Sequence, residues 1–260
     1  MVNKFERFIK RFYLIIIFIF LYAPIVTLMV YSFNDSKSMG RWNGFTFKWY
    51  AELLHNDSLI EALYYTILIA LIASIIATIV GTLTAIGINN MRGKRKSLLL
   101  SVNNLPIINP DIVTGVALMS LFIFLRFNFG FKTMLLAHIS FDIPYVILSV
   151  LPKLRQLPDN TIEAAMDLGA TPLYALRKVI IPQIKPGIFA GFLMAFTMSI
   201  DDFVISFFTT GPGVTNLSIE IYSMARRGIK PEINALSTLM FLTVLILLLI
   251  AKRKKKVEVN

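Results

Sequence analysis

The chain of 260 residues has no cysteine and only two histidines, His55 and His138. Without cysteine it can form neither a disulfide framework nor a thiolate metal site. The H-E-x-x-H and G-x-S-x-G patterns are also missing, which argues against an intramembrane hydrolase. No G-x-x-x-x-G-K-[ST] loop is present, so the chain cannot cradle ATP phosphates itself. We therefore expect no enzyme activity, no metal site and no cofactor in this chain.

Charged residues are scarce as well. They make up 16% of the chain, against about 25% in a typical soluble domain. Hydrophobic residues reach 56% and the mean hydropathy is +0.70. The net charge of +11 would suit a nucleic-acid partner, but the basic residues cluster at the ends of apolar runs. Membrane orientation explains them better, and we expect no nucleic-acid binding.

Six apolar runs are long enough to cross about 30 Å of hydrocarbon. They cover residues of about 13–33, 62–88, 98–125, 133–151, 188–208 and 233–251. The first run ends in "VYSFNDS" rather than in a small-residue cleavage site, which favours a retained span over a signal peptide. Asparagines and prolines interrupt the first half of the third run. The sequence predicts an all-α membrane protein with one six-span domain over residues 1–260.

The distribution of lysine and arginine predicts the orientation of these spans. With the N-terminus inside, the cytoplasmic segments hold four, four, five and five of the 26 basic residues, and the outer segments hold three, two and three. Both termini and the loop 152–187 are thus predicted to be cytoplasmic. The tail "KRKKK" is explained by this rule, although specific binding of anionic lipid is an alternative.

Two of the runs carry small residues at every fourth position. The rows are Ala73, Ala77, Gly81 and Ala85 in the second run, and Gly187, Gly191, Ala195 and Ser199 in the fifth. Residues four apart share one face of a helix, and small side chains let two helix backbones approach closely in lipid. We expect these faces to pack against other helices, in this chain or in another membrane subunit.

The loop between the fourth and fifth runs is polar and shows the signals of two short helices. Asn160 and Glu163 fit a capping box, and Gly169 suits a left-handed helix end. Thr171 and Pro172 fit the start of a second helix, which Pro182 is expected to end. Such order exceeds what a simple connector needs, so the loop is predicted to be a docking surface, with packing on its own bundle as the alternative.

Within this loop, "EAAMDLG", nine further residues and "VIIP" resemble the EAA loop of binding-protein-dependent ABC importer permeases. The family pattern is Glu-Ala-Ala, three residues, Gly, nine residues and Ile-x-Leu-Pro, from which Val179 and Ile181 depart conservatively. The resemblance implies that the loop is a coupling helix seated on a cytoplasmic ATPase. It implies coupling roles for Glu163, Ala164, Ala165, Asp167, Gly169, Ala170 and Pro182.

Further segments are similar to the spermidine/putrescine branch of that family, among them "PDIVTGVALMSLF", "SIDDFVISFFTTGPG" and "IEIYSMARRGIKPEINALST". The resemblance implies a type I importer fold in the bacterial inner or plasma membrane. It also implies a second homologous permease, an ATPase dimer that binds ATP and Mg²⁺, membrane lipid around the spans, and an extracytoplasmic polyamine-binding protein. Import of another small cationic or polar solute is the alternative.

Four aspartates lie inside predicted spans: Asp111, Asp142, Asp201 and Asp202. An aspartate at the centre of a bilayer costs about 2.5–3.5 kcal/mol on insertion scales, so an internal setting is expected. No lysine or arginine lies in any span core, and unpaired carboxylates in a cavity attract cations. We predict a substrate pathway along these residues, with Asp201 contacting the cation and Asp202 gating or bonding between helices. The alternative is that an aspartate, Asp111 above all, caps a broken helix.

A proton-coupled carrier is the rival transport mechanism. His138 and Asp142 are four residues apart and share a helix face, as a proton relay would require. A histidine that only packs between helices explains the same pair. A proton-coupled carrier mechanism would also leave the EAA loop without a role.

Overall fold

The computed structural model describes residues 4–37, 40–158, 160–228 and 230–257, and the elements in this part of the chain are helices. In chain order they are α1 (Lys4–Tyr31), α2 (Lys48–Leu54), α3 (Asp57–Asn90), α4 (Gly93–Ile108), α5 (Asp111–Phe124), α6 (Phe131–Leu154), α7 (Thr161–Asp167), α8 (Pro172–Ala175), a π-helical turn (Leu176–Ile180), α9 (Ile181–Asp201), α10 (Val204–Thr209), α11 (Leu217–Arg227) and α12 (Glu232–Val257). The contacts divide the chain into two compact units, one formed by residues 1–60 with 221–260 and the other by residues 61–220.

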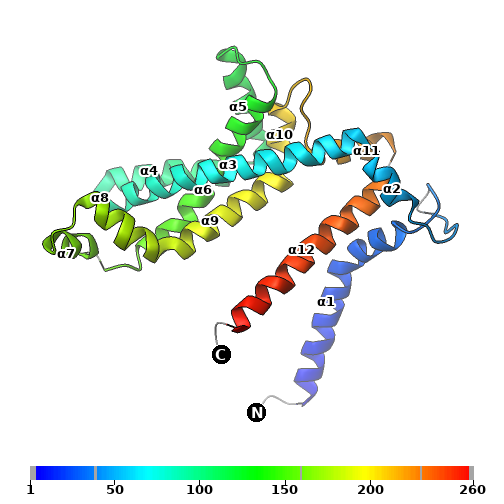
Figure 1. Ribbon diagram of the computed structural model, residues 1–260, viewed down its shortest axis with the longest axis horizontal. Helices are drawn as coiled ribbons and strands as arrows, with labels where there is room; N and C mark the ends of the chain where they lie inside the picture. Colours follow the sequence, from blue (N-terminus) through cyan, green and yellow to red (C-terminus); the bar gives the residue numbers. More distant parts are fainter. Residues whose placement is uncertain (1–3, 38–39, 159, 229, 258–260) are drawn as a thin grey trace. The chain divides into compact units, whose positions relative to one another are not determined.

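In the first unit, α1 and α12 pack against each other (Figure 1). The short helix α2 also packs on α12, and the Asn56 amide donates a hydrogen bond of 2.8 Å to Glu232 at the start of α12. Trp49 of α2 is buried, and its indole N–H donates to the carbonyl of Asn34 at 2.6 Å. These contacts stabilise the segment between the first and second apolar runs, which the sequence predicts to lie on the outer side of the membrane.

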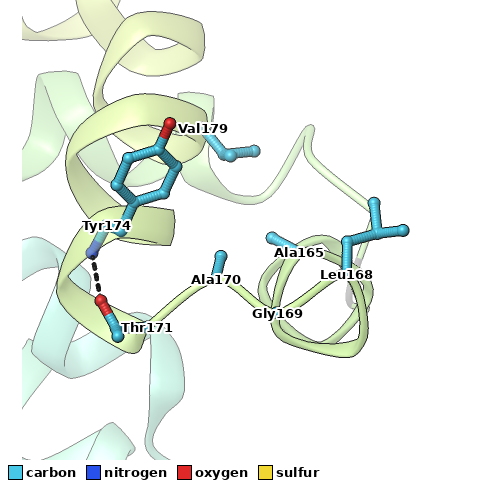
Figure 2. Close-up of a pocket in the computed structure, with 7 residues that line it drawn as sticks. All are labelled: Ala165, Leu168, Gly169, Ala170, Thr171, Tyr174 and Val179. Carbon is cyan, nitrogen blue, oxygen red and sulfur yellow. Dashed lines mark hydrogen bonds between the residues drawn. The ribbon is translucent and has the colours of Figure 1, made fainter.

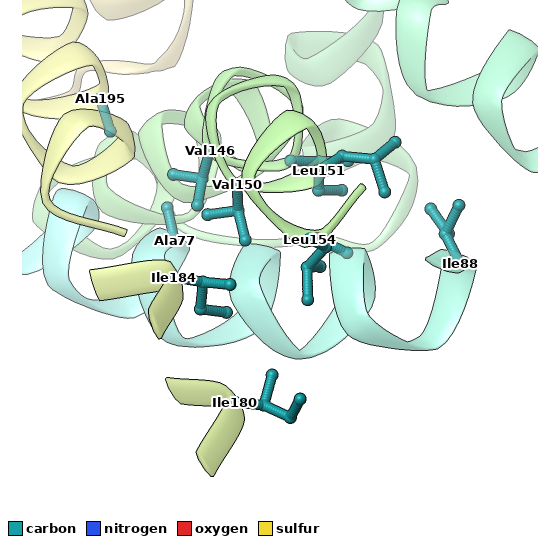
Figure 3. Close-up of a cluster of buried hydrophobic side chains, with 11 residues drawn as sticks. Ala77, Ile88, Val146, Val150, Leu151, Leu154, Ile180, Ile184 and Ala195 are labelled. Carbon is teal, nitrogen blue, oxygen red and sulfur yellow. The ribbon is translucent and has the colours of Figure 1, made fainter. Parts of the chain in front are cut away.

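In the second unit, α3, α6 and α9 lie alongside one another (Figure 1). Figure 3 shows their shared core, to which α3 contributes Ala77, Ala85 and Ile88, α6 contributes residues from Val146 to Leu154, and α9 contributes Ile184 and Ala195. Burial of a single branched aliphatic side chain stabilises a core by about 1.5–3 kcal/mol. This core fixes the helices that carry both candidate sites.

The two rows of small residues lie at the closest helix contacts. A Cβ atom added at Gly81 of α3 would lie 2.8 Å from the Val146 side chain of α6. At Gly187 of α9 it would lie 2.7 Å from Lys153 of α6. Ala73, Ala77, Ala85, Ala195 and Ser199 are buried too. The predicted packing role of these rows is confirmed, and α6 is the helix against which both rows pack.

Among the described residues, four helices are long and apolar enough to cross a membrane: Ile9–Tyr31, Asp57–Asn90, Phe131–Leu154 and Pro172–Asp201. A fifth span results if the pair Gly93–Ile108 and Asp111–Phe124 is counted as one, although these helices are bent by 105°. The sixth apolar run, 233–251, falls within α12. The total of six spans and the cytoplasmic termini stay predictions.

Two predicted spans are broken rather than continuous. In the third, Asn109 is extended because the ring of Pro110 disfavours the helical conformation in the residue before it. In the fifth, α9 ends at Asp201, and Asp202 is extended with ψ 125° before α10 begins at Val204. The runs 98–125 and 188–208 therefore each form two helices, in agreement with the alternative of a broken helix.

The loop also corrects two expectations. The Asn160 side chain caps nothing, so the capping box is absent. The helix does not end at Pro182, because the π-helical turn Leu176–Ile180 shifts the hydrogen bonds and Ile181 N–H donates to the carbonyl of Leu176. Pro182 then lies in the first turn of α9, where a missing N–H costs little.

Candidate functional site

The first candidate site is the surface of the loop that joins α7 to α8. The N–H of Gly169 donates to the carbonyl of Met166 at 2.8 Å, and the N–H of Ala170 donates to that of Ala165 at 3.1 Å. This pair of bonds is a Schellman motif, which needs a left-handed residue, and Gly169 has φ +88°. The predicted glycine conformation is confirmed. Thr171 then accepts from the N–H of Tyr174 and starts α8 as predicted.

Between these two helices lies a hollow of about 440 Å³ (Figure 2). It is lined by Ala165, Leu168, Gly169, Ala170, Thr171, Tyr174 and Val179. Around it, four large apolar side chains point into solvent, with exposed fractions of 91% for Leu168, 64% for Leu173, 57% for Tyr174 and 44% for Met166. Apolar side chains gathered on an otherwise polar loop are typical of a surface that contacts another protein or a membrane.

The remaining residues predicted for this surface lie on it or beside it. Glu163, Ala164 and Asp167 are exposed on α7, and Pro182 is exposed at the start of α9. Ala165 and Ala170 are half-buried beneath them. The structure brings all of the predicted coupling residues except Pro182 into the α7–α8 segment.

The second candidate site lies where the two broken spans meet. Gly115 of α5 faces α10 so closely that an added Cβ would lie 2.9 Å from Phe208 and 3.5 Å from the carbonyl of Val204. Gly115 is one turn from the start of α5 at Asp111, and Val204 is the first residue of α10. The break before Asp111 and the break at Asp201–Phe203 are thus close together. Paired helix breaks are a common way to build a transport site at mid-membrane.

Asp202 holds the second break together. Its carboxylate accepts hydrogen bonds from the N–H groups of Ile205 at 3.1 Å and Ser206 at 2.7 Å, as an N-cap does. The Asn216 side chain donates to the Asp202 carbonyl and to the Ser206 hydroxyl, at 3.0 and 2.7 Å. The capping alternative considered for the aspartates is therefore realised at Asp202.

His138 of α6 connects the two sides of this break. Its ring nitrogens lie 2.6 Å from the hydroxyl of Ser199 on α9 and 2.9 Å from that of Ser206 on α10. Nε2 lies 3.7 Å from the Asp202 carboxylate. Buried polar groups that satisfy one another in this way fix a single arrangement of the helices. His138 therefore bonds between helices rather than only packing, and it makes no hydrogen bond to Asp142, the partner expected in a proton relay.

The other three aspartates have different surroundings. Asp111 and Asp201 are exposed, and neither forms an ion pair within the described residues. Asp142 is fully buried, and neither of its oxygens has a hydrogen-bond partner there. Asp142 nevertheless lies within Coulombic reach of Asp202, and Tyr145 within that of both Asp111 and Asp142. Asp111 and Asp201 are thus accessible at the two breaks, whereas Asp142 is enclosed by the surrounding helices.

Sequence reasoning missed the residues that complete this network, Ser206 and Asn216. Both lie in the segment "SIDDFVISFFTTGPG" or just after it, where an isolated serine or asparagine carries no pattern of its own. The described part of the chain contains no group of three or more His, Asp or Glu side chains arranged to hold a metal ion. Within the described residues, the acidic groups at the breaks are therefore not grouped as a set of metal ligands.

The family model and the relatives that match this chain are all membrane components of transport systems. The family model described as "Binding-protein-dependent transport system inner membrane component" matches residues 77–253. The chain is 38% identical to the spermidine/putrescine transport system permease protein PotC of Escherichia coli K12 over 254 residues, covering 96% of each chain. It is 41% identical to the putrescine transport system permease protein PotI of the same strain, covering 85% of this chain and 82% of that one.

Among solved structures, the chain matches one from a bacterial ABC transporter involved in the import of the acidic polysaccharide alginate. The TM-score is 0.72 over 98% of both chains. At 13% identity, this likeness concerns the fold alone.

Proposed function

Since the chain belongs to the family of binding-protein-dependent transport system inner membrane components, we propose that it is a permease subunit of an ABC importer for polyamines. The substrate class rests on one observation: Asp111 and Asp201 stand exposed at the meeting of two helix breaks, with no cation of the described chain paired to either. Polyamines are flexible polycations that suit such a pair of carboxylates. The names of the two Escherichia coli relatives support the same class.

The exposed apolar residues of the α7–α8 loop give the chain a surface for an ATPase. In this proposal the permease pairs with a second, homologous permease, and two ATPase subunits bind ATP and Mg²⁺ below them. An extracytoplasmic polyamine-binding protein delivers the substrate. The chain itself catalyses no reaction. Closing of the ATPase dimer moves the loop, and the spans reorient to open the path to the other side.

This assembly can be tested by purification. Affinity-tagged chain, extracted from membranes in mild detergent, should bring with it one other permease and an ATPase whose activity rises when polyamine and binding protein are added. Recovery of the chain alone, with transport activity retained after reconstitution, would instead favour a secondary carrier.

Six spans with both termini in the cytoplasm complete the proposal, and the absence of native cysteine makes a clean labelling test possible. Single substitutions Lys94→Cys and Lys254→Cys should react with a membrane-impermeant maleimide only from the cytoplasmic side, because basic residues favour that side. Asn43→Cys should react only from outside. Labelling of Lys94→Cys from outside in intact cells would overturn this topology.

A further inference from the structure

A second, larger hollow lies on the other side of the α7–α8 loop, between that loop and the ends of α3 and α6. Its volume is about 600 Å³. Ile86 of α3, Leu154 of α6 and Ile180 of the π-helical turn give it an apolar part. Its polar part includes Arg92, Lys96, Arg155 and Glu163. None of the functions assigned above uses this space.

The charges that line the hollow are mainly positive, since three basic side chains face one carboxylate there. Lys96 donates a hydrogen bond of 3.1 Å to the carbonyl of Asn89, which offsets the partial negative charge at the end of α3. Within the described residues, neither Arg92 nor Arg155 forms an ion pair. The guanidinium groups of Arg92 and Arg155 can therefore bind an anion.

The start of α4 adds to this positive field. Arg92 is extended at the N-cap position, and its side chain caps nothing, so the first N–H groups of the 16-residue helix α4 have no side-chain acceptor there. A helix N-terminus carries a partial positive charge and favours anions. This partial charge adds to the positive charge of the arginines, but the helix N-terminus is not proposed as a binding site by itself.

We propose that this hollow binds a phosphate-bearing anion, held by Arg92 and Arg155 with Lys96 beside them. Guanidinium groups match phosphate oxygens with paired, charge-assisted hydrogen bonds. The apolar part of the hollow suits the carbon atoms that follow the phosphate in a phospholipid. The proposal rests on the cytoplasmic placement given under Proposed function, which puts the ends of α3 and α6 at the level of the inner headgroups. The phosphate comes from an anionic phospholipid or from free phosphate.

Occupancy of the hollow bears on coupling because α7 forms part of its wall. Thr161, Ile162 and Glu163 line the hollow, and Ile162 also packs against the core of α3, α6 and α9. An anion held by Arg92 and Arg155 would lie in the same hollow as the Glu163 carboxylate of α7 and would repel it, so its binding would change the position of α7 against the bundle. The lipid or phosphate content of the cytoplasmic side would then affect how firmly the coupling loop is placed.

The test uses the complete transporter complex in lipid nanodiscs. The variant Arg92→Gln/Arg155→Gln removes both guanidinium groups, and the matched control Lys94→Gln/Arg95→Gln removes two exposed charges of the same segment that do not line the hollow. Native mass spectrometry counts the phosphatidylglycerol molecules retained per permease in mixed phosphatidylcholine and phosphatidylglycerol discs. A second arm measures the shift in melting temperature on adding inorganic phosphate in pure phosphatidylcholine discs.

We expect the wild type and the control to retain phosphatidylglycerol, or to melt at a higher temperature when inorganic phosphate is added. The Arg92→Gln/Arg155→Gln variant should bind the same anion with an affinity lower by about tenfold or more. Retention of the lipid alone identifies phospholipid as the source, and a response to inorganic phosphate alone identifies the free ion. Equal responses from the two double variants, in both arms, would overturn the proposal. Both readouts need no transport, so a failure to import polyamine leaves this test intact.

Discussion

At the scale of the residue, the loop surface depends on the backbone of Gly169. A Cβ atom added there meets nothing within 4 Å, so any substitution acts through the backbone conformation at φ +88° and not through a clash. A β-branched residue is strained in this region, whereas asparagine adopts it more readily. Strain of this kind costs about 1–3 kcal/mol, enough to displace a short surface motif without unfolding the bundle.

Gly169→Val should therefore lower polyamine uptake and weaken co-purification of the ATPase, with normal membrane insertion. Gly169→Asn is the graded control and should keep most of both activities. The measurement is ATPase recovered per permease, together with uptake in cells. Normal uptake and normal ATPase recovery for Gly169→Val would rule out this role for the turn.

Two adjacent aspartates have different roles at the same scale. Asp201 is exposed and unpaired within the described residues, whereas Asp202 caps α10 through Ile205 and Ser206. Asp201→Asn should reduce polyamine uptake by about tenfold or more with unchanged thermal stability, because a lost charge-assisted hydrogen bond is worth roughly 1.5–3 kcal/mol.

Asp202→Ala should lower the free energy of unfolding of the purified complex by about 0.5–2 kcal/mol, the usual cost of a lost N-cap, and Asp202→Asn should restore most of it. Uptake and thermal melting are measured on all three variants. The assignment is wrong if Asp201→Asn transports normally, and a defect in Asp142→Asn in the same assay would place the path along α6 instead.

At the scale of the element, one helical run connects the two candidate sites. Pro172 to Asp201 covers 30 residues, from the loop surface to the second helix break. At 1.5 Å per residue this run is about 45 Å long. It contains the π-helical turn Leu176–Ile180 near the loop, and beyond that turn it packs along α6 through Gly187, Gly191 and Ala195. We therefore expect a displacement at the loop to reach Asp201 through this run.

The close packing of these helices gives a prediction with an internal control in α3. An added Cβ at Gly81 would lie 2.8 Å from Val146, but at Gly87 it would meet nothing within 4 Å. Gly81→Ala should destabilise the subunit by about 1–3 kcal/mol through overpacking. Gly87→Ala should be neutral or stabilising by up to about 1 kcal/mol, because alanine favours the helix. Thermal melting in detergent compares the two, and equal melting temperatures would contradict the close approach of α3 and α6.

The sequence was most informative where a local rule decides the structure. The left-handed Gly169 and the start of α8 at Thr171 are set by neighbours in the chain, and the sequence predicts both. The small-residue rows are predicted from their four-residue spacing, although the sequence does not show that α6 is their partner. The break at Asp202 depends on a side chain that prefers capping α10 to continuing α9, a choice that His138 and Asn216 support from other elements. The complete burial of Asp142 likewise depends on tertiary packing. No periodicity in the sequence signals either one.

At the scale of the whole molecule, the chain combines a surface for a partner, a long helix and an acidic break, which together suit a subunit of a larger machine. The chain carries no ATP-binding loop of its own, and we propose that a separate ATPase drives its motion. The family membership and the fold agree with that division of labour. Within such a machine, we propose that this subunit forms the path for polyamines.

The most direct test is uptake of radiolabelled spermidine and putrescine into proteoliposomes that contain the purified complex, with binding protein on the accessible side and ATP on the other. We expect accumulation of at least one polyamine that requires ATP and drops about tenfold with Asp201→Asn. Accumulation of a neutral or anionic solute under the same conditions, with neither polyamine transported, would contradict a polyamine path through this subunit.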